Sequence, residues 1–216
     1  MLNIAIIDDR AKLRETIHRL INATIPEGWN CQSYPPLNDL DDYNSFINNE
    51  EISVLILDEL LHEQAEDSDS HVSYNGHDVA NYMRNFNSEF PIHIITSYKD
   101  NEALNDSGES FDSIYDRNEF IRNSEKIVPR LVRSAMRYIE TNEKKLAELT
   151  RLSQKKAADN LTQDENVRLL ALQEELNIKA SSSTVTDIVE IVSNIESNLS
   201  TLDSLIKNIN EQLKES

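Results

Sequence analysis

The sequence is poor in the residues that build covalent or metal-based frameworks. Its 216 residues include a single cysteine, Cys31, which excludes an intramolecular disulfide and a cysteine-rich zinc cluster. The 5 histidines have no spacing typical of metal ligands, and we expect structural or solvated roles for them. No apolar run approaches the roughly 20 residues that a bilayer-spanning helix needs, so we expect no membrane partner.

Positive charge is also scarce. The chain has 21 lysines and arginines against 39 aspartates and glutamates, which gives a net charge of -18 at pH 7. Contacts with nucleic-acid phosphates require clustered basic side chains, so we expect no nucleic-acid partner. A strand pattern begins almost at the N-terminus, and we therefore expect no cleavable signal peptide and a cytoplasmic protein.

Two short apolar runs end abruptly in carboxylates. The run 4–7 is followed by Asp8 and Asp9, and the run 54–57 is followed by Asp58. Apolar runs of this length, rich in β-branched residues, are typical of strands buried on both faces of a parallel sheet. In such sheets the functional site lies at the carboxyl ends of the strands, so we expect these acids to meet at one edge.

The residue types at this edge favour phosphoryl chemistry. Three acids packed together repel one another unless a cation lies among them, and hard oxygen ligands suit Mg²⁺. A third run, 91–95, ends in Thr96 and supplies a hydroxyl donor to the same edge. Asp58 is then a candidate carboxylate nucleophile. An acid after a strand can also be a simple turn residue or helix cap, an alternative that stays open for Asp9.

Helical patterns alternate with the strands. We expect a second strand over 29–34 and a fifth over 111–115, with helices over 12–23, 40–48, 78–85 and 100–105. Alternation of strand and helix predicts an α/β fold with a parallel sheet and helices on both sides.

Residues 1 to about 123 resemble the receiver domain of two-component response regulators. The resemblance rests on the acid pair after the first strand, the single acid after the third, Thr96-Ser97 after the fourth, and Gly76 before the third helix. It implies a doubly wound, flavodoxin-like sheet of five parallel strands. It also implies that Asp58 accepts a phosphoryl group from the phosphohistidine of a histidine kinase or phosphotransfer protein.

The same resemblance implies roles for the neighbouring residues. Asp8 and Asp9 would hold Mg²⁺ together with Asp58, and the backbone carbonyl of Leu60 would be a further ligand. Thr96 would hydrogen-bond a phosphoryl oxygen and report phosphorylation.

Three features depart from the family pattern. The family has a lysine after the fifth strand, and the alignment places Asp116 at that position, where an acid would repel a phosphoryl group. Arg117 and Lys99 are both open as replacements. Glu59 follows the acceptor where the family favours an apolar residue, and the acidic stretch 63–70 lengthens the next loop.

The C-terminal region, 124–216, contains neither glycine nor a proline after residue 129. We expect a helix over about 125–152, a second over about 163–179 that begins with the capping box Thr162–Glu165, and a third with a strict heptad seam. The seam consists of Val185, Ile188, Val192, Ile195, Leu199, Leu202, Ile206, Ile209 and Leu213. It can pair within the chain or form a coiled coil between chains, and both alternatives stay open.

Two functions of different classes are compatible with this sequence. The first is a phosphorelay response regulator that signals through its helical tail, as a homodimer or with an effector protein, or that serves as a phosphate sink. The second is a pseudo-receiver that acts as a dimerisation or scaffold protein without phosphorylation. We expect no enzymatic activity beyond self-phosphorylation and self-dephosphorylation at Asp58.

Overall fold

The computed structural model describes residues 2–62, 72–99, 104 and 110–176. The chain divides into two compact units, Met1–Thr141 and Asn142–Ser216. The sequence instead suggests a receiver boundary after residue 123, and that boundary stays a prediction. The heptad seam and the acidic stretch 63–70 lie outside the described residues.

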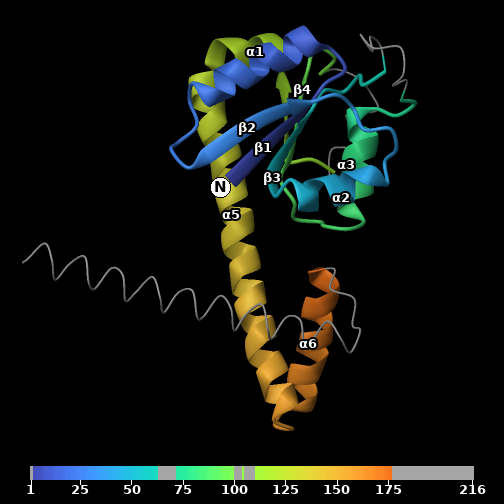
Figure 1. Ribbon diagram of the computed structural model, residues 1–216, viewed down its shortest axis with the longest axis vertical. Coiled ribbons are helices and arrows are strands. Elements are labelled where there is room, and N and C mark those ends of the chain that lie inside the picture. Colours follow the sequence, from blue (N-terminus) through green and yellow to red (C-terminus); the bar gives the residue numbers. More distant parts are fainter. Residues whose placement is uncertain (1, 63–71, 100–103, 105–109, 177–216) are drawn as a thin grey trace, which may run out of the picture. The chain divides into compact units, whose positions relative to one another are not determined.

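The first unit is built on one sheet of five parallel strands (Figure 1). Their order is β2-β1-β3-β4-β5, which is the order of flavodoxin-like doubly wound folds. The strands are β1 (Leu2–Ile7), β2 (Trp29–Tyr34), β3 (Ile52–Leu57), β4 (Ile92–Thr96) and β5 (Ser113–Asp116). The predicted fold class of this unit is therefore confirmed.

Helices cover both faces of this sheet (Figure 1). One face packs on α1 (Ala11–Asn22) and the N-terminal part of α5 (Arg117–Ala157), and the other packs on α2 (Asp42–Asn49) and α3 (Gly76–Arg84). Successive strand residues point to opposite faces of the sheet. Ile4 and Ile6 therefore pack in the core beneath α1 and α5, while Ala5 and Ile7 pack in the core beneath α2 and α3. The continuous apolar runs of the sequence follow from this two-sided burial.

Two helices begin earlier than the sequence suggests. Helix α3 begins at Gly76 because the carboxylate of Asp78 accepts a hydrogen bond from the backbone N–H of Asn75, 2.8 Å away. Helix α5 begins at Arg117, and its backbone departs from helical geometry at Asn123, with φ -124° and ψ 20°. The expected helix over 100–105 lies outside the described residues except for Leu104, which is buried.

The second unit is described from Asn142 to Leu176. Here the C-terminal part of α5 pairs with α6 (Gln163–Glu175) around a small leucine core. The predicted capping box begins α6, since the backbone N–H of Glu165 donates to Thr162 and the Glu165 carboxylate accepts from the Thr162 N–H. The buried core residues are Leu149, Leu152, Leu169 and Leu172.

Ion pairs border this leucine core. Arg168 lies 2.9 Å from Glu148 and 3.0 Å from Glu175, and Lys155 lies 2.6 Å from Glu165. Hydrogen bonds from Lys155 and from the Thr162 backbone lower the pKa of Glu165 to about 2. The pairs Arg168–Glu148 and Lys155–Glu165 join α5 to α6 across the turn, whereas Arg168–Glu175 lies within α6.

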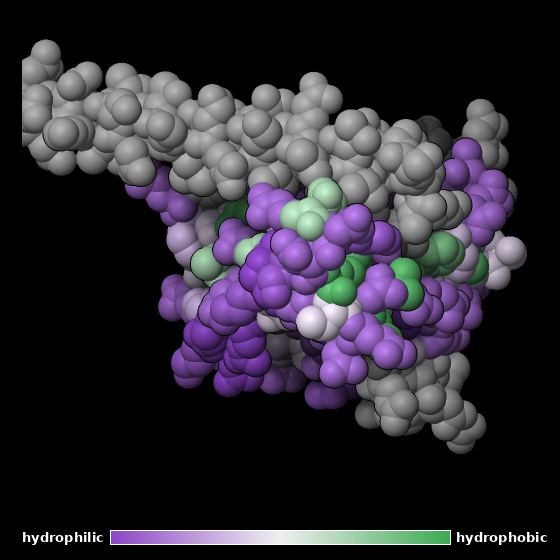
Figure 2. Space-filling model, turned by 90° about the horizontal axis from the view of Figure 1, so that it is seen from below, coloured by the Kyte–Doolittle hydropathy of each residue, from purple (hydrophilic) through white to green (hydrophobic). Residues whose placement is uncertain are grey.

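Among the residues coloured by hydropathy in Figure 2, hydrophilic ones predominate, with small hydrophobic patches between them. Among the helices that the structure describes, none combines the length and the apolar character required to cross a membrane.

Candidate functional site

Three aspartates meet at the carboxyl edge of the sheet. Asp8 and Asp9 follow β1, and Asp58 follows β3, the strand that pairs with β1 in the register Ile7 to Leu57. All three side chains are buried, and one oxygen from each lies within 4.8 Å of the others. The structure therefore brings together the three acids that the sequence places at this edge.

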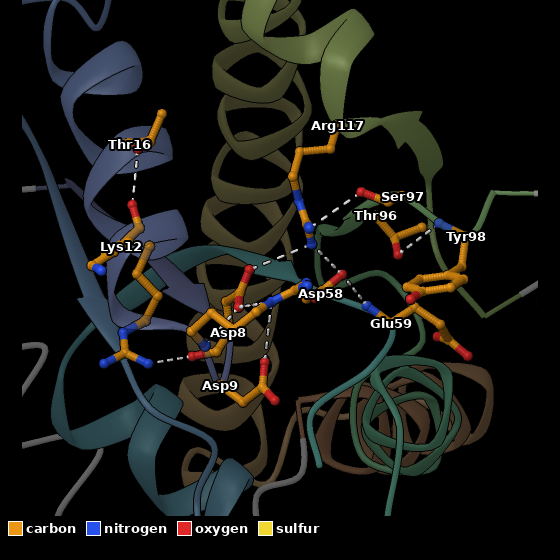
Figure 3. A network of polar contacts seen from close by, with 12 residues as sticks. Asp8, Asp9, Lys12, Thr16, Asp58, Glu59, Thr96, Ser97, Tyr98 and Arg117 are labelled. Atoms are coloured by element: carbon orange, nitrogen blue, oxygen red, sulfur yellow. Dashed lines mark hydrogen bonds and ion pairs between the residues drawn. The ribbon is translucent and has the colours of Figure 1, made fainter. Parts of the chain in front are cut away.

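Two arginines face these acids. Arg10 follows Asp9 directly; its Nη2 lies 2.5 Å from Oδ2 of Asp58, and its Nε lies 3.5 Å from Oδ1 of both Asp8 and Asp9. Arg117 enters from the start of α5, and its Nη2 lies 2.7 Å from Oδ1 of Asp58 and 3.5 Å from Oδ2 of Asp8 (Figure 3). We define these three acids and two arginines as the acceptor cluster.

Positive charge in the acceptor cluster falls short of the negative charge. Counted at formal charges, three carboxylates against two guanidinium groups leave one net negative charge in the cluster as defined. The guanidinium of Arg14 lies at the edge of the cluster, where Nη1 donates to the backbone carbonyl of Asp8 at 2.5 Å. Burial, and next the charge of Asp58, raise the pKa of Asp8 to about 6, while the Arg10 backbone N–H and both arginines oppose the rise. Within the cluster, the two arginines thus do not fully offset the burial and mutual repulsion of the acids.

A divalent cation fits this donor set. Oxygen Oδ2 of Asp8 is buried and accepts no hydrogen bond from the described residues. Carboxylate oxygens from three converging side chains are the hard ligands that Mg²⁺ prefers. The carbonyl of Leu60 stays a prediction as a further ligand.

Thr96 ends β4 beside the last residue of β5. Its side chain is fully buried, and its hydroxyl oxygen accepts a hydrogen bond from the backbone N–H of Tyr98 at 3.2 Å (Figure 3). A threonine hydroxyl has one proton to donate in addition to its acceptor lone pairs. Thr96 can therefore keep this bond and still donate to an anion.

The carboxylate of Asp116, the residue predicted at the family's lysine position, points to the start of α5. It pairs in register with Thr96, but its carboxylate accepts from the backbone N–H of Glu119 at 2.9 Å, in the first turn of α5. Anions stabilise helix N-termini, and this contact accounts for an acid at this position.

Of the two candidate replacements for the lysine, Arg117 is the one that contacts Asp58. Arg117 also donates from Nη1 to the Ser97 hydroxyl at 3.2 Å, which fixes the guanidinium between the ends of β3 and β4. Lys99 instead lies 3.9 Å from Glu119 on the surface.

The carboxylate of Glu59 is bound by His77, outside the acceptor cluster. Its backbone N–H donates to Oδ1 of Asp58 at 2.8 Å, while its buried carboxylate accepts from Nδ1 of His77 at 2.6 Å and from the His77 backbone N–H. Burial raises the pKa of Glu59, and the hydrogen bonds from His77 partly offset the rise. The carboxylate of Glu59 is therefore bound to α3 through His77.

Gly76 allows α3 to approach the acceptor strand closely. A Cβ at this position would lie 2.1 Å from the carbonyl oxygen of Asp58, whereas the backbone N–H of Gly76 donates to the Glu59 carbonyl at 2.9 Å. Only glycine fits this contact without displacing the backbone of Asp58.

Sequence reasoning missed Arg10 and His77. Arg10 stands directly after the acid pair, and this adjacency was the available signal, although it does not show which way a long side chain turns. His77 has no local signal because its partner, Glu59, lies 18 residues earlier in the chain.

The strand order and the helices on both faces of the sheet decide the fold. The first unit has the fold of a response-regulator receiver domain. Among solved structures, the BeF3-activated DrrB receiver domain is 17% identical, with a TM-score of 0.45, and the match covers 62% of this chain and 98% of that one. The response regulator TrrA from Thermotoga maritima, in complex with Mg²⁺-BeF, is 18% identical with a TM-score of 0.44, and the match covers 59% of this chain and 96% of that one.

An uncharacterized protein from Neptuniibacter caesariensis is 15% identical, with a TM-score of 0.50, and the match covers 64% of this chain and 93% of that one. At such identities the likeness concerns the fold of the receiver domain. No protein-family model and no curated protein matches the sequence.

Proposed function

We propose that the chain is a two-component response regulator whose Asp58 accepts a phosphoryl group from the phosphohistidine of a histidine kinase or phosphotransfer protein. The observation that carries this proposal is the environment of Asp58, a buried carboxylate at the end of a central strand beside two further acids and a guanidinium. Burying three acids at one sheet edge costs free energy, and this cost favours a role for them in binding or chemistry.

In the proposed transfer, an oxygen of Asp58 forms a bond to phosphorus while the bond from phosphorus to the donor histidine nitrogen breaks. The electron pair of that bond leaves with the imidazole, which takes up a proton. Arg117 and the backbone N–H of Glu59 already lie at Asp58 and would donate to the transferred oxygens. Thr96 would donate its hydroxyl proton to another of these oxygens.

We also propose that Asp8, Asp9, Asp58 and the Leu60 carbonyl hold Mg²⁺. Bound there, the cation would neutralise charge on the phosphoryl oxygens. Two observations support this assignment: Oδ2 of Asp8 accepts no hydrogen bond from the described residues, and oxygens of the three carboxylates converge.

For the output we propose an interaction role. The described part of the second unit is a helical hairpin, which suits contact with a second copy of the chain or with an effector protein. The alternative is a phosphate sink, in which Asp58 takes up phosphoryl groups but its phosphorylation does not change the contacts of the hairpin.

A pseudo-receiver scaffold is the second candidate. It is favoured by the two arginines on Asp58, which satisfy the acceptor charge without a phosphoryl group. In that case the acceptor cluster would be a buried ion network that holds β1, β3 and α5 together.

Intact-mass measurement after incubation with a small-molecule phosphodonor and Mg²⁺ separates the two candidates, with light scattering on the same sample. We expect a gain of one phosphoryl group that is absent in Asp58→Asn, and a change in scattering mass if the tail responds. No phosphoryl gain together with a constant mass would overturn the response-regulator proposal in favour of the scaffold.

A further inference from the structure

Arg10 contacts every acid of the acceptor cluster. Its guanidinium reaches all three acids, with Nη2 on Asp58 and Nε equidistant from Asp8 and Asp9. A single cation that contacts these three carboxylates at once stands where a metal ion would draw its ligands. The sequence and the family resemblance assign no role to this residue.

We propose that Arg10 is an internal counter-ion that binds the acceptor cluster in alternation with a divalent cation, so that Arg10 sets the affinity of this site for Mg²⁺. This inference rests on the proposed metal site and is independent of whether Asp58 is phosphorylated.

Alternation follows from the geometry of the ligands. Mg²⁺ demands near-ideal octahedral geometry with oxygens at about 2.0–2.1 Å. The Asp58 oxygen that it would use is already bound by the guanidinium at 2.5 Å, and a second cation in the same space would be repelled by the first. Arg10 must therefore leave before the site accepts a metal ion.

The two arginines differ in their freedom to leave. The side chain of Arg10 is 19% exposed, whereas that of Arg117 is 6% exposed and is also bound to Ser97. The backbone of Arg10 is held by its own N–H, which donates to Oδ1 of Asp8 at 2.9 Å. The guanidinium of Arg10 can thus turn to solvent while its backbone and Arg117 stay in place.

Departure of Arg10 also changes the acceptor itself. Oxygen Oδ1 of Asp58 is bound by the Glu59 N–H and approached by Arg117, and oxygen Oδ2 is bound by Arg10. When Arg10 leaves, Oδ2 loses this hydrogen bond. Departure of Arg10 and cation binding then become one event, in which Oδ2 passes from the guanidinium to the cation and is covered in both states.

Titration calorimetry with MgCl2 alone, without a phosphodonor, tests this inference. We expect Arg10→Gln to lower the Kd for Mg²⁺ by roughly tenfold or more, because the internal competitor is gone and net negative charge rises. The matched control is Arg19→Gln, which makes the same charge change on α1 at an exposed residue paired with Glu15, and should change Kd by less than about twofold. An equal or weaker affinity in folded Arg10→Gln would overturn the inference.

Thermal melting followed by circular dichroism supplies a second readout. Without metal, Arg10→Gln should melt below the wild type because the acids lose a counter-ion, and MgCl2 should raise its Tm more than that of the wild type. If the variant is unfolded without metal, MgCl2 should restore its helical signal. A variant that stays unfolded at saturating MgCl2 would show that the cation does not replace Arg10.

These outcomes separate the inference from the proposed function. Tighter Mg²⁺ binding by Arg10→Gln, with no phosphorylation of any variant, would support the counter-ion role and reject the response regulator. Phosphorylation of the wild type, together with equal Mg²⁺ affinities of the wild type and Arg10→Gln, would support the response regulator and reject the counter-ion role. Absence of Mg²⁺ binding by both proteins would reject the inference together with the proposed metal site.

Discussion

Nη2 of Arg117 lies 2.7 Å from Oδ1 of Asp58, so that the first residue of α5 is paired with the acid that follows β3. Both side chains are almost completely buried, and buried charges are tolerated only when they are paired. Arg117 thereby contributes to the stability of the fold and, in our proposal, to the binding of the transferred phosphoryl group.

Replacement of Arg117 by glutamine should lower both stability and phosphorylation. Removing one partner of a buried ion pair costs up to about 3–5 kcal/mol in free energy of unfolding, and Arg10 would remain on Asp58 as a partial compensation. Urea denaturation and the rate of phosphoryl gain by intact mass check the two effects. Lys99→Gln is the control and should change the unfolding free energy by less than about 0.5 kcal/mol, since its pairing with Glu119 is exposed. If Lys99→Gln slowed phosphorylation more than Arg117→Gln does, Lys99 and not Arg117 would be the residue that contacts the phosphoryl group.

Replacement of Gly76 by alanine should displace the backbone of Asp58. The added Cβ would meet the carbonyl oxygen at 2.1 Å, and such overpacking typically costs about 1–3 kcal/mol. Gly28→Ala provides the comparison, because Gly28 has φ +88° and a methyl group added there would meet nothing within 4 Å, so only backbone strain applies. Both variants should be destabilised, but only Gly76→Ala should also slow phosphorylation. Equal phosphorylation rates in the two variants would contradict the close contact.

Stability should fall on mild acidification because of His93. This buried histidine lies between the hydroxyls of Ser113 at 2.7 Å and Ser134 at 2.9 Å. Burial lowers its pKa from 6.5 to about 4, with Asp112 opposing the shift and Arg84 adding to it. The unfolded chain therefore binds the proton first, and the contribution present above pH 6.5 is lost as the pH falls towards 4.

Urea denaturation at pH 7 and pH 5 measures this effect. His93 should account for a loss of about 2 kcal/mol between these values, because each pH unit below the unfolded pKa costs roughly 1.4 kcal/mol. The glutamine of His93→Gln cannot titrate and can still hydrogen-bond to both serines. The loss of unfolding free energy between pH 7 and pH 5 should therefore be about 2 kcal/mol smaller in this variant than in the wild type. An identical pH dependence in the two proteins would show that His93 does not carry it.

The pairing of α5 with α6 should depend on buried leucines and not on exposed ones. Leu152→Ala removes a fully buried side chain from a core with few members, and a change of this kind costs about 2–5 kcal/mol. Leu170→Ala is the matched control, since that side chain is 51% exposed. Hydrogen exchange of the amides in α6 should accelerate strongly in the first variant and little in the second. Similar exchange in both would mean that ion pairs such as Arg168–Glu148 hold the hairpin.

Most elements of the first unit, and the three acids at one edge, were predictable from local patterns. Strand runs such as 4–7 and 54–57 are apolar throughout because both faces of the sheet are covered, and this pattern is visible without any partner. The acids follow directly from the strand ends, since parallel neighbours carry their carboxyl ends to one edge. The capping box at Thr162 is similarly local, because its donors and acceptors lie three residues apart.

The sequence by itself thus determined the sheet and the position of Asp8, Asp9 and Asp58, whereas only the tertiary structure decided which side chains neutralise them. Arg10 meets Asp58 from 48 residues away, and Arg117 contacts the same acid from another helix. Asp116 was expected to repel a phosphoryl group, yet its carboxylate caps α5. Long side chains choose partners by packing and charge in three dimensions, and no periodicity along the chain records that choice.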